Sequence, residues 1–232
     1  MILGKIVKSN SHIDYICQIY GLYEVDVVPS PVDYAFGSLV QMAIHSKQRD
    51  RLQGKLNLTL VTNHTSTTSV VGVIYDTILL NPAFGSVGPH LSNETQVELF
   101  SPDYFSEKAV LTYILVLGMM EREITPSGEL ETLSIMHGVP LLSLDLGSEV
   151  ETMTDEEVRA FHFFSDQGAA GNQTPYLHLG YLPHIIAQRN SLLPMVILRI
   201  IDQLEYLFPQ NLSLLSIVKR NFAWRLKVEP TG

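Results

Sequence analysis

Residues 70–80, Val70-Val71-Gly72-Val73-Ile74-Tyr75-Asp76-Thr77-Ile78-Leu79-Leu80, are the segment from which the rest of the chain can be interpreted. The segment is rich in β-branched residues and is followed by the turn signal Asn81-Pro82. A continuous apolar run of this length, bounded by polar and turn residues, predicts a strand that is buried on both faces. Such a strand needs neighbours on both edges and a cover, so we expect it in the middle of a sheet or barrel.

Further strand candidates surround this segment, with turn chemistry between them. Pro29, Pro31 and the Thr/Ser tract of residues 62–69 are typical of connections rather than of regular strands. The first half of the chain shows little helical periodicity, and closure of its strands into a cylinder would remove exposed edges. We therefore predict a small antiparallel β-barrel of about six strands over residues 1–120. The candidate strands are residues 2–7, 13–20, 35–44, 56–61, 70–80, 97–100 and 109–117.

The pattern changes after Met120. Residues 121–153 contain Pro126, Gly128, Pro140 and Gly147, and we interpret them as a connector. Residues 154–232 are predicted to be helical, with helices over residues 154–164, 179–189, 191–208 and 211–226. The first of these begins with a capping box, Thr154-Asp155-Glu156-Glu157, in which the hydroxyl and the carboxylate each satisfy a free amide. The predicted fold class is therefore α+β.

Composition restricts the classes of function. The chain has 232 residues, of which 46% are hydrophobic and only 17% are charged, which favours some surface that is buried against a partner. The formal net charge of −9 argues against broad nucleic-acid binding. The single cysteine, Cys17, excludes an internal disulfide framework, and no run of apolar residues is long enough to span a membrane. Since the first residues also do not form a signal peptide, we expect a cytoplasmic protein.

Motifs of the common enzyme classes are absent from the sequence. It contains no Gly-x-x-x-x-Gly-Lys-Ser/Thr phosphate loop, no Gly-x-Ser-x-Gly elbow and no His-Glu-x-x-His zinc motif. The eight histidines are scattered, and the spacing of His178 and His184 does not place them on one helix face for a shared metal. We therefore predict no enzyme activity, no cofactor and no metal site.

Two features remain as candidate sites of interaction. Asp76 lies inside an apolar strand, where a carboxylate must be paired, hydrogen-bonded or turned to solvent. A structural hydrogen bond explains it better than a catalytic or partner-binding role. The second feature is a basic cluster near the C-terminus, which could bind nucleic acid or an acidic partner but is also ordinary for a helix end. The cluster consists of Lys219, Arg220, Arg225 and Lys227, with Phe222 and Trp224 between them.

Three segments of the first half resemble the HAS-barrel family. They are Gly4-Lys5-Ile6-Val7-Lys8-Ser9-Asn10-Ser11-His12, Asp33-Tyr34-Ala35-Phe36-Gly37 and Val71-Gly72-Val73-Ile74-Tyr75-Asp76. HAS-barrels are small β-barrels at the N-terminus of HerA-type DNA-translocating ATPases, related to the crown barrels of rotary ATP synthases. The resemblance implies a barrel that assembles rings and docks partners such as a nuclease. The motor that would carry a phosphate loop is missing here, so the resemblance does not extend to ATP hydrolysis.

The sequence thus predicts a non-catalytic interaction or assembly module. It would dock a HerA-like ATPase or nuclease in DNA processing, or associate with itself. The candidate interaction residues are Asp76, Asn81, Phe84, Lys219, Arg220 and Trp224. Two alternatives stay open: a small hydrolase that uses Asp76 with a nearby histidine such as His12, and a barrel that binds single-stranded nucleic acid.

Overall fold

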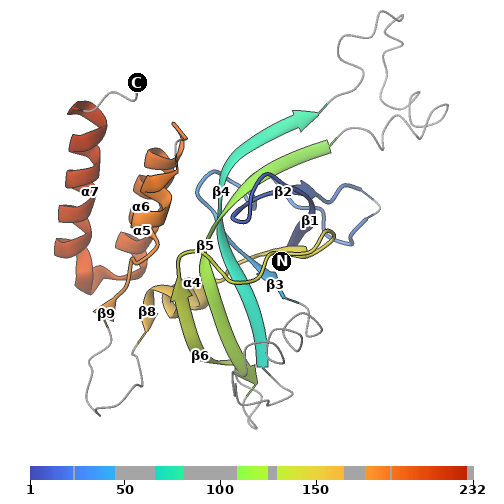
Figure 1. The fold of residues 1–232 in the computed structure, drawn as a ribbon, viewed down its shortest axis with the longest axis horizontal. Helices are drawn as coiled ribbons and strands as arrows, with labels where there is room; N and C mark the ends of the chain where they lie inside the picture. The colour runs from blue at the N-terminus through green and yellow to red at the C-terminus, as the bar shows by residue number, and fades with distance from the viewer. Residues whose placement is uncertain are drawn as a thin grey trace, which may run out of the picture.

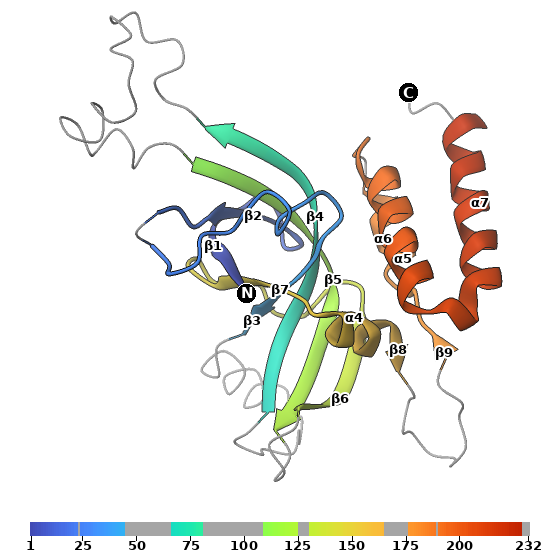
Figure 2. The ribbon, with the colours of Figure 1, turned by 180° about the vertical axis from the view of Figure 1, so that it is seen from behind.

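Strands close into a cylinder, with helices along one side (Figures 1 and 2). The computed structural model describes residues 1–22, 24–44, 66–80, 109–124, 130–164, 176–188 and 190–228. The strands of the main sheet are β1 (Ile2–Ser9), β2 (Asp14–Ile19), β3 (Leu39–Ala43), β4 (Ser66–Leu80), β5 (Ala109–Ile124), β6 (Leu130–His137) and β7 (Glu149–Thr152). The remaining elements are α4 (Asp155–His162), β8 (Phe163–Phe164), β9 (Tyr176–Leu177), α5 (Leu182–Ala187), α6 (Leu193–Leu207), η1 (Pro209–Asn211) and α7 (Leu212–Val228). The predicted α+β class is confirmed.

Six antiparallel strands form the closed barrel, in the order β1-β2-β5-β4-β3-β7 and back to β1. Closure depends on β5, because its residues 111–115 pair with β4 on one edge and with β2 on the other. Farther along, residues 118–124 of β5 leave β2 and pair with β6 instead. Strand β6 therefore extends the sheet beyond the cylinder.

The sixth barrel strand comes from a part of the chain where the sequence predicts a connector. Strand β7 lies between β1 and β3, and both β6 and β7 belong to residues 121–153. The barrel therefore does not end at residue 120, and the connector assignment needs correction. The reason is physical: β7 has only four residues, too few for a periodic pattern, and its partners are remote in sequence. The strands predicted at residues 56–61 and 97–100 lie outside the described residues.

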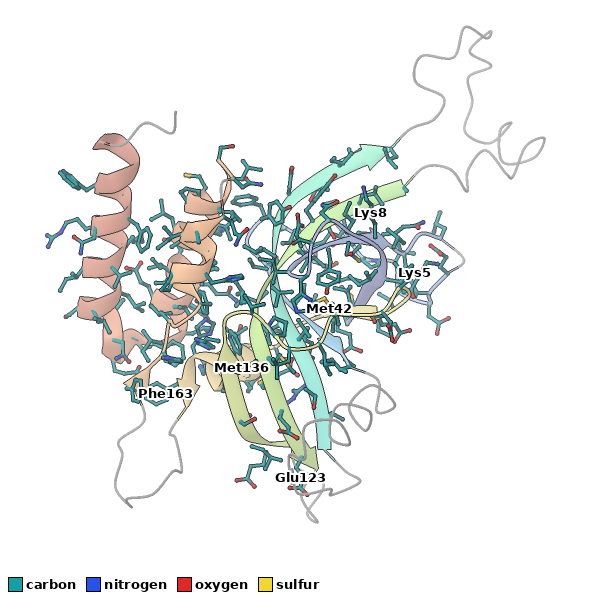
Figure 3. All side chains as sticks on the ribbon, in the orientation of Figure 1. Lys5, Lys8, Met42, Glu123, Met136 and Phe163 are labelled. Carbon is teal, nitrogen blue, oxygen red and sulfur yellow. The ribbon has the colours of Figure 1, made fainter. Side chains whose placement is uncertain are left out.

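Strand β4 is buried on both faces over residues 69–75, as its sequence predicts. Residues 77–80, for which the sequence predicts the same burial, are exposed because β4 runs past the end of β2 there. Val70 and Ile74 belong to the cluster inside the barrel, whereas Val71 and Val73 belong to the cluster that the helices cover. Figure 3 shows Met42 of β3 among the densely packed side chains of the barrel. The inner cluster consists of Leu3, Ile6, Tyr15, Cys17, Ile19, Val40, Met42, Ile44, Val70, Ile74, Ile114, Val116 and Val150. One long strand thus joins two hydrophobic cores.

Glycine stands where two backbones approach closely. A side chain at Gly4 of β1 would place its Cβ 2.0 Å from the carbonyl oxygen of Gln18 on β2. At Gly118, where β5 passes from β2 to β6, a Cβ would lie 2.2 Å from the carbonyl oxygen of Met136. Neither position can hold a larger residue without separating the strands.

Helix α4 begins where its capping signal predicts, whereas α5 and α6 begin at residues 182 and 193 rather than at the predicted 179 and 191. Thr154 and Glu157 form the predicted capping box at the start of α4, which ends at His162 rather than residue 164. Prolines occupy the first turns of α5 and α6, where the missing amide costs little. Helix α6 packs its apolar stripe on the outer face of β4, and α7 packs on α6 as the outermost layer (Figures 1 and 2).

Candidate functional site

The candidate residues fall on two separate layers of the molecule. Asp76 lies on β4 of the barrel, whereas Lys219, Arg220 and Trp224 lie on α7, with α6 between the two elements (Figure 1). Asn81 and Phe84 lie outside the described residues. The structure therefore does not gather the candidates into one site, and each layer must be considered separately.

Asp76 stands beside a bulge of β4 and has a local structural role. Its Oδ1 accepts a hydrogen bond from the backbone N–H of Thr77 at 2.8 Å. The register of β4 against β5 shifts at Tyr75, whose hydroxyl donates to Oδ1 of Asp14 at 2.9 Å. These two hydrogen bonds hold the bulge in place. The Asp76 carboxylate is thus hydrogen-bonded to a backbone amide, which is a structural role.

His12, the suggested partner of Asp76 in the hydrolase alternative, has a different neighbour. Its Nε2 donates to the carbonyl oxygen of Pro140 at 2.6 Å. General acid–base catalysis needs the two groups within hydrogen-bond reach of one another or of a shared substrate. The hydrogen bonds described here for Asp76 and His12 are each made with a backbone group of the fold, and not with each other.

The end of the barrel next to Asp76 exposes apolar side chains. Strands β4 and β5 continue past the end of β2 as a two-stranded ribbon, visible in Figures 1 and 2. On this ribbon Ile78, Leu79 and Leu80 are 39%, 74% and 46% exposed. The connection from β2 to β3 leaves the same end of the barrel, and it adds the exposed residues Val27, Val28 and Val32. We call these six residues the barrel-end patch.

A cluster of histidines, which the sequence does not predict, lies where β6, α4 and the turn before α5 meet. Nδ1 of the fully buried His162 donates to the carbonyl oxygen of Val158 at 2.8 Å, and its Nε2 accepts from the Tyr181 hydroxyl at 2.8 Å. His137 accepts from the N–H of Gly180 through Nδ1 and donates to the carbonyl oxygen of Phe161 through Nε2, both at 3.0 Å. All four ring nitrogens are thus occupied by protein groups.

The histidine cluster joins β6, α4 and the turn before α5 through hydrogen bonds of uncharged imidazole rings. Burial lowers the pKa of His162 to about 3 and that of His137 to about 4. The ring of His178 stacks on that of His137, with 4.4 Å between the centroids. Within the described residues, no group of histidine, cysteine and acidic side chains has the geometry of a metal site. The histidines are contributed by three distant segments, so no spacing in the sequence could have revealed them.

The basic residues of α7 differ in their surroundings. Nζ of Lys219 lies 2.7 Å from Asp202 and 2.6 Å from Glu205, so this lysine anchors α7 to α6. Arg220 is exposed, and Trp224 is 63% exposed. Trp224 borders a hollow of about 480 Å³ that is also lined by Val218, Asn221 and Phe222. This end of α7 therefore presents an apolar and cationic surface.

Comparison with known proteins places the whole chain in one family. A family model described as "Domain of unknown function (DUF8166)" matches residues 1–231. The chain belongs to the DUF8166 family. No curated protein matches the chain. The match covers the barrel and the helices together, so both are parts of what defines the DUF8166 family. Among the helices that the structure describes, none is long and apolar enough to cross a membrane.

Proposed function

We propose that this DUF8166 protein is a non-catalytic assembly module of the cytoplasm. Its barrel docks a HerA-like ATPase or the nuclease that works with one in DNA processing, or it pairs with a second copy of itself. The barrel-end patch supports this proposal. Apolar side chains exposed at one end of a β-barrel are costly in water and are stabilised when another protein covers them.

The interior of the barrel also supports a contact role. Its cluster is apolar and buried, with exposed fractions of 8% or less. Small-molecule sites are usually concave pockets with a few convergent polar groups. Here the polar side chains on the helical side, such as His137, His162 and Arg122, form hydrogen bonds within the chain. The outer surface at the barrel end is therefore the favoured place for function.

The test compares two leucines of similar exposure on the same sheet. Leu80, in the patch, is 46% exposed, and Leu133 of β6 is 44% exposed. We expect Leu80→Asp to abolish self-association in light scattering, or capture of a purified HerA-like ATPase or its nuclease from the same host. Leu133→Asp should leave both unchanged, because β6 pairs with the opposite end of β5.

Circular dichroism must show that both variants retain the β-strand signal, because the comparison is valid only between folded proteins. If the Leu80→Asp protein is folded and still forms the same complexes with unchanged affinity, the barrel end is not the docking surface. If the wild-type chain stays monomeric and captures neither the ATPase nor the nuclease, the proposed function is wrong.

A further inference from the structure

Helix α7 has two apolar stripes, and only one of them is packed. Leu215 is fully buried, and Val218 and Phe222 pack partly against the core. The second stripe comprises Leu214, Ile217, Asn221 and Trp224, in which the three apolar side chains are 47%, 49% and 63% exposed. Figure 3 shows that the side chains of α7 turned away from α6 have no described element beside them. We call these four residues the outer stripe.

The spacing of the outer stripe is that of a helix-pairing seam. Successive members are separated by three, four and three residues, which is the alternation of a and d positions in a heptad. Asn221 stands in the middle of the stripe, where a single polar residue fixes the register of two paired helices. The hollow beside Asn221 and Trp224 provides a recess for an apolar side chain of a second helix.

Charge determines which kind of helix fits. Helix α7 contains four basic residues and no acidic one, although the chain as a whole carries a net charge of −9. Asp202 and Glu205 neutralise Lys219 from α6, whereas Arg220 is exposed next to the stripe. A second copy of α7 would bring like charges together, and an acidic helix would bring opposite ones.

We propose that the outer stripe binds an amphipathic helix of another protein whose apolar seam is flanked by acidic residues. The partner helix would lie along α7, with leucine-like side chains over Ile217 and Trp224 and carboxylates next to Arg220. This surface is separate from the barrel-end patch, on the far side of α6. It goes beyond the proposed function, and either surface can fail its test while the other passes.

Trp224 makes the test direct because it is the single tryptophan of the chain. Its fluorescence reports only on this stripe. The probe is a synthetic helical peptide with leucine at the a and d positions and glutamate at the flanking positions. Added to the full chain, it should shift the emission to shorter wavelength, and the affinity should fall as salt rises. A matched peptide with lysine at the flanking positions should produce no shift.

Two variants localise the contact while keeping the reporter. Ile217→Glu should weaken binding of the glutamate peptide by at least about tenfold, as expected for a central contact. Leu212→Glu should bind as the wild type does, because Leu212 is 44% exposed but lies outside the stripe. Circular dichroism verifies that both variants are folded.

Three results would overturn the inference. One is equal binding of the lysine and glutamate peptides, which would remove the charge argument. Another is no shift with either peptide. The third is a shift with phosphatidylserine vesicles but not with the glutamate peptide, which would make α7 a membrane-surface helix instead.

Discussion

Arg122 of β5 and Glu157 of α4 form an ion pair that joins the barrel wall to the first helix. Their side chains are only 11% and 17% exposed. Gln41 of β3 hydrogen-bonds both, donating to Oε1 of Glu157 at 3.0 Å and accepting from Nη2 of Arg122 at 2.8 Å. The second carboxylate oxygen, Oε2, accepts from the backbone N–H of Thr154 at 2.8 Å. Glu157 therefore caps its own helix and attaches that helix to two strands.

The first prediction concerns this carboxylate. Glu157→Gln should lower the free energy of unfolding by about 3 kcal/mol, because it leaves the Arg122 charge partly buried without its counter-charge. Urea denaturation at pH 7 measures the change. Glu156→Gln is the matched control, since Glu156 occupies the same helical turn but is exposed. Equal stability of the Glu157→Gln and Glu156→Gln proteins would show that the ion pair contributes nothing.

The second prediction concerns acid. Burial lowers the pKa values of His162 and His137 below the ordinary 6.5, to about 3 and about 4. Below pH 6.5 the unfolded chain takes up protons that the folded chain refuses, so stability falls as pH decreases towards 4. Each histidine contributes a slope approaching about 1.4 kcal/mol per pH unit in this window.

Urea denaturation between pH 7 and pH 4.5 tests this slope. The expected loss corresponds to about two protons taken up on unfolding, one for each buried ring. His137→Gln should remove about half of the slope. If the free energy of unfolding did not change between pH 7 and pH 4.5, neither imidazole would be held neutral in the folded state.

Glu157 acts in a lower window. Burial raises the pKa of its carboxyl group, but the hydrogen bonds from Thr154, Arg122 and Gln41 outweigh burial and hold the pKa below 4.5. Its contribution is therefore complete above pH 4.5 and is lost as pH falls through the folded pKa. The Glu157→Gln protein should lose less stability than the wild type below pH 4.5, with the same losses at higher pH.

The third prediction concerns the seam between β1 and β2. Gly4→Ala should destabilise the barrel by about 3 kcal/mol, at the upper end of the cost of overpacking, because the new Cβ meets the Gln18 carbonyl oxygen. The melting temperature measures the effect. Gly21→Ala is the control: its Cβ would lie 3.8 Å from Oε2 of Glu24, an ordinary van der Waals contact, and the substitution should cost little. Similar melting temperatures for the two variants would mean that β1 and β2 separate easily.

The fourth prediction concerns the bulge of β4. Tyr75→Phe removes the hydroxyl that binds Asp14 and should cost about 1 kcal/mol, the usual net value of one hydrogen bond. Tyr206→Phe serves as the control because Tyr206 is 80% exposed. Chemical denaturation distinguishes them. A Tyr75→Phe protein as stable as the Tyr206→Phe protein would contradict the anchoring role.

The sequence predicts individual candidate residues but not which of them lie together in the fold. The sequence predicts Trp224 and Arg220 as interaction residues, and both side chains are exposed. Lys219 was grouped with them, yet it is occupied by Asp202 and Glu205, because helix pairing brings α6 beside α7. The outer stripe is defined by which face of α7 packs on α6, and that is a tertiary contact.

Local patterns in the sequence alone determined the burial of residues 70–75 of β4 on both faces and the capping box at Thr154 and Glu157. Each depends on neighbours within a few residues, so short-range chemistry suffices. Only the tertiary structure decided that β7 completes the barrel and that His137, His162 and Tyr181 meet. These arrangements bring together segments distant along the chain, and their partners are selected by the packing of the whole domain.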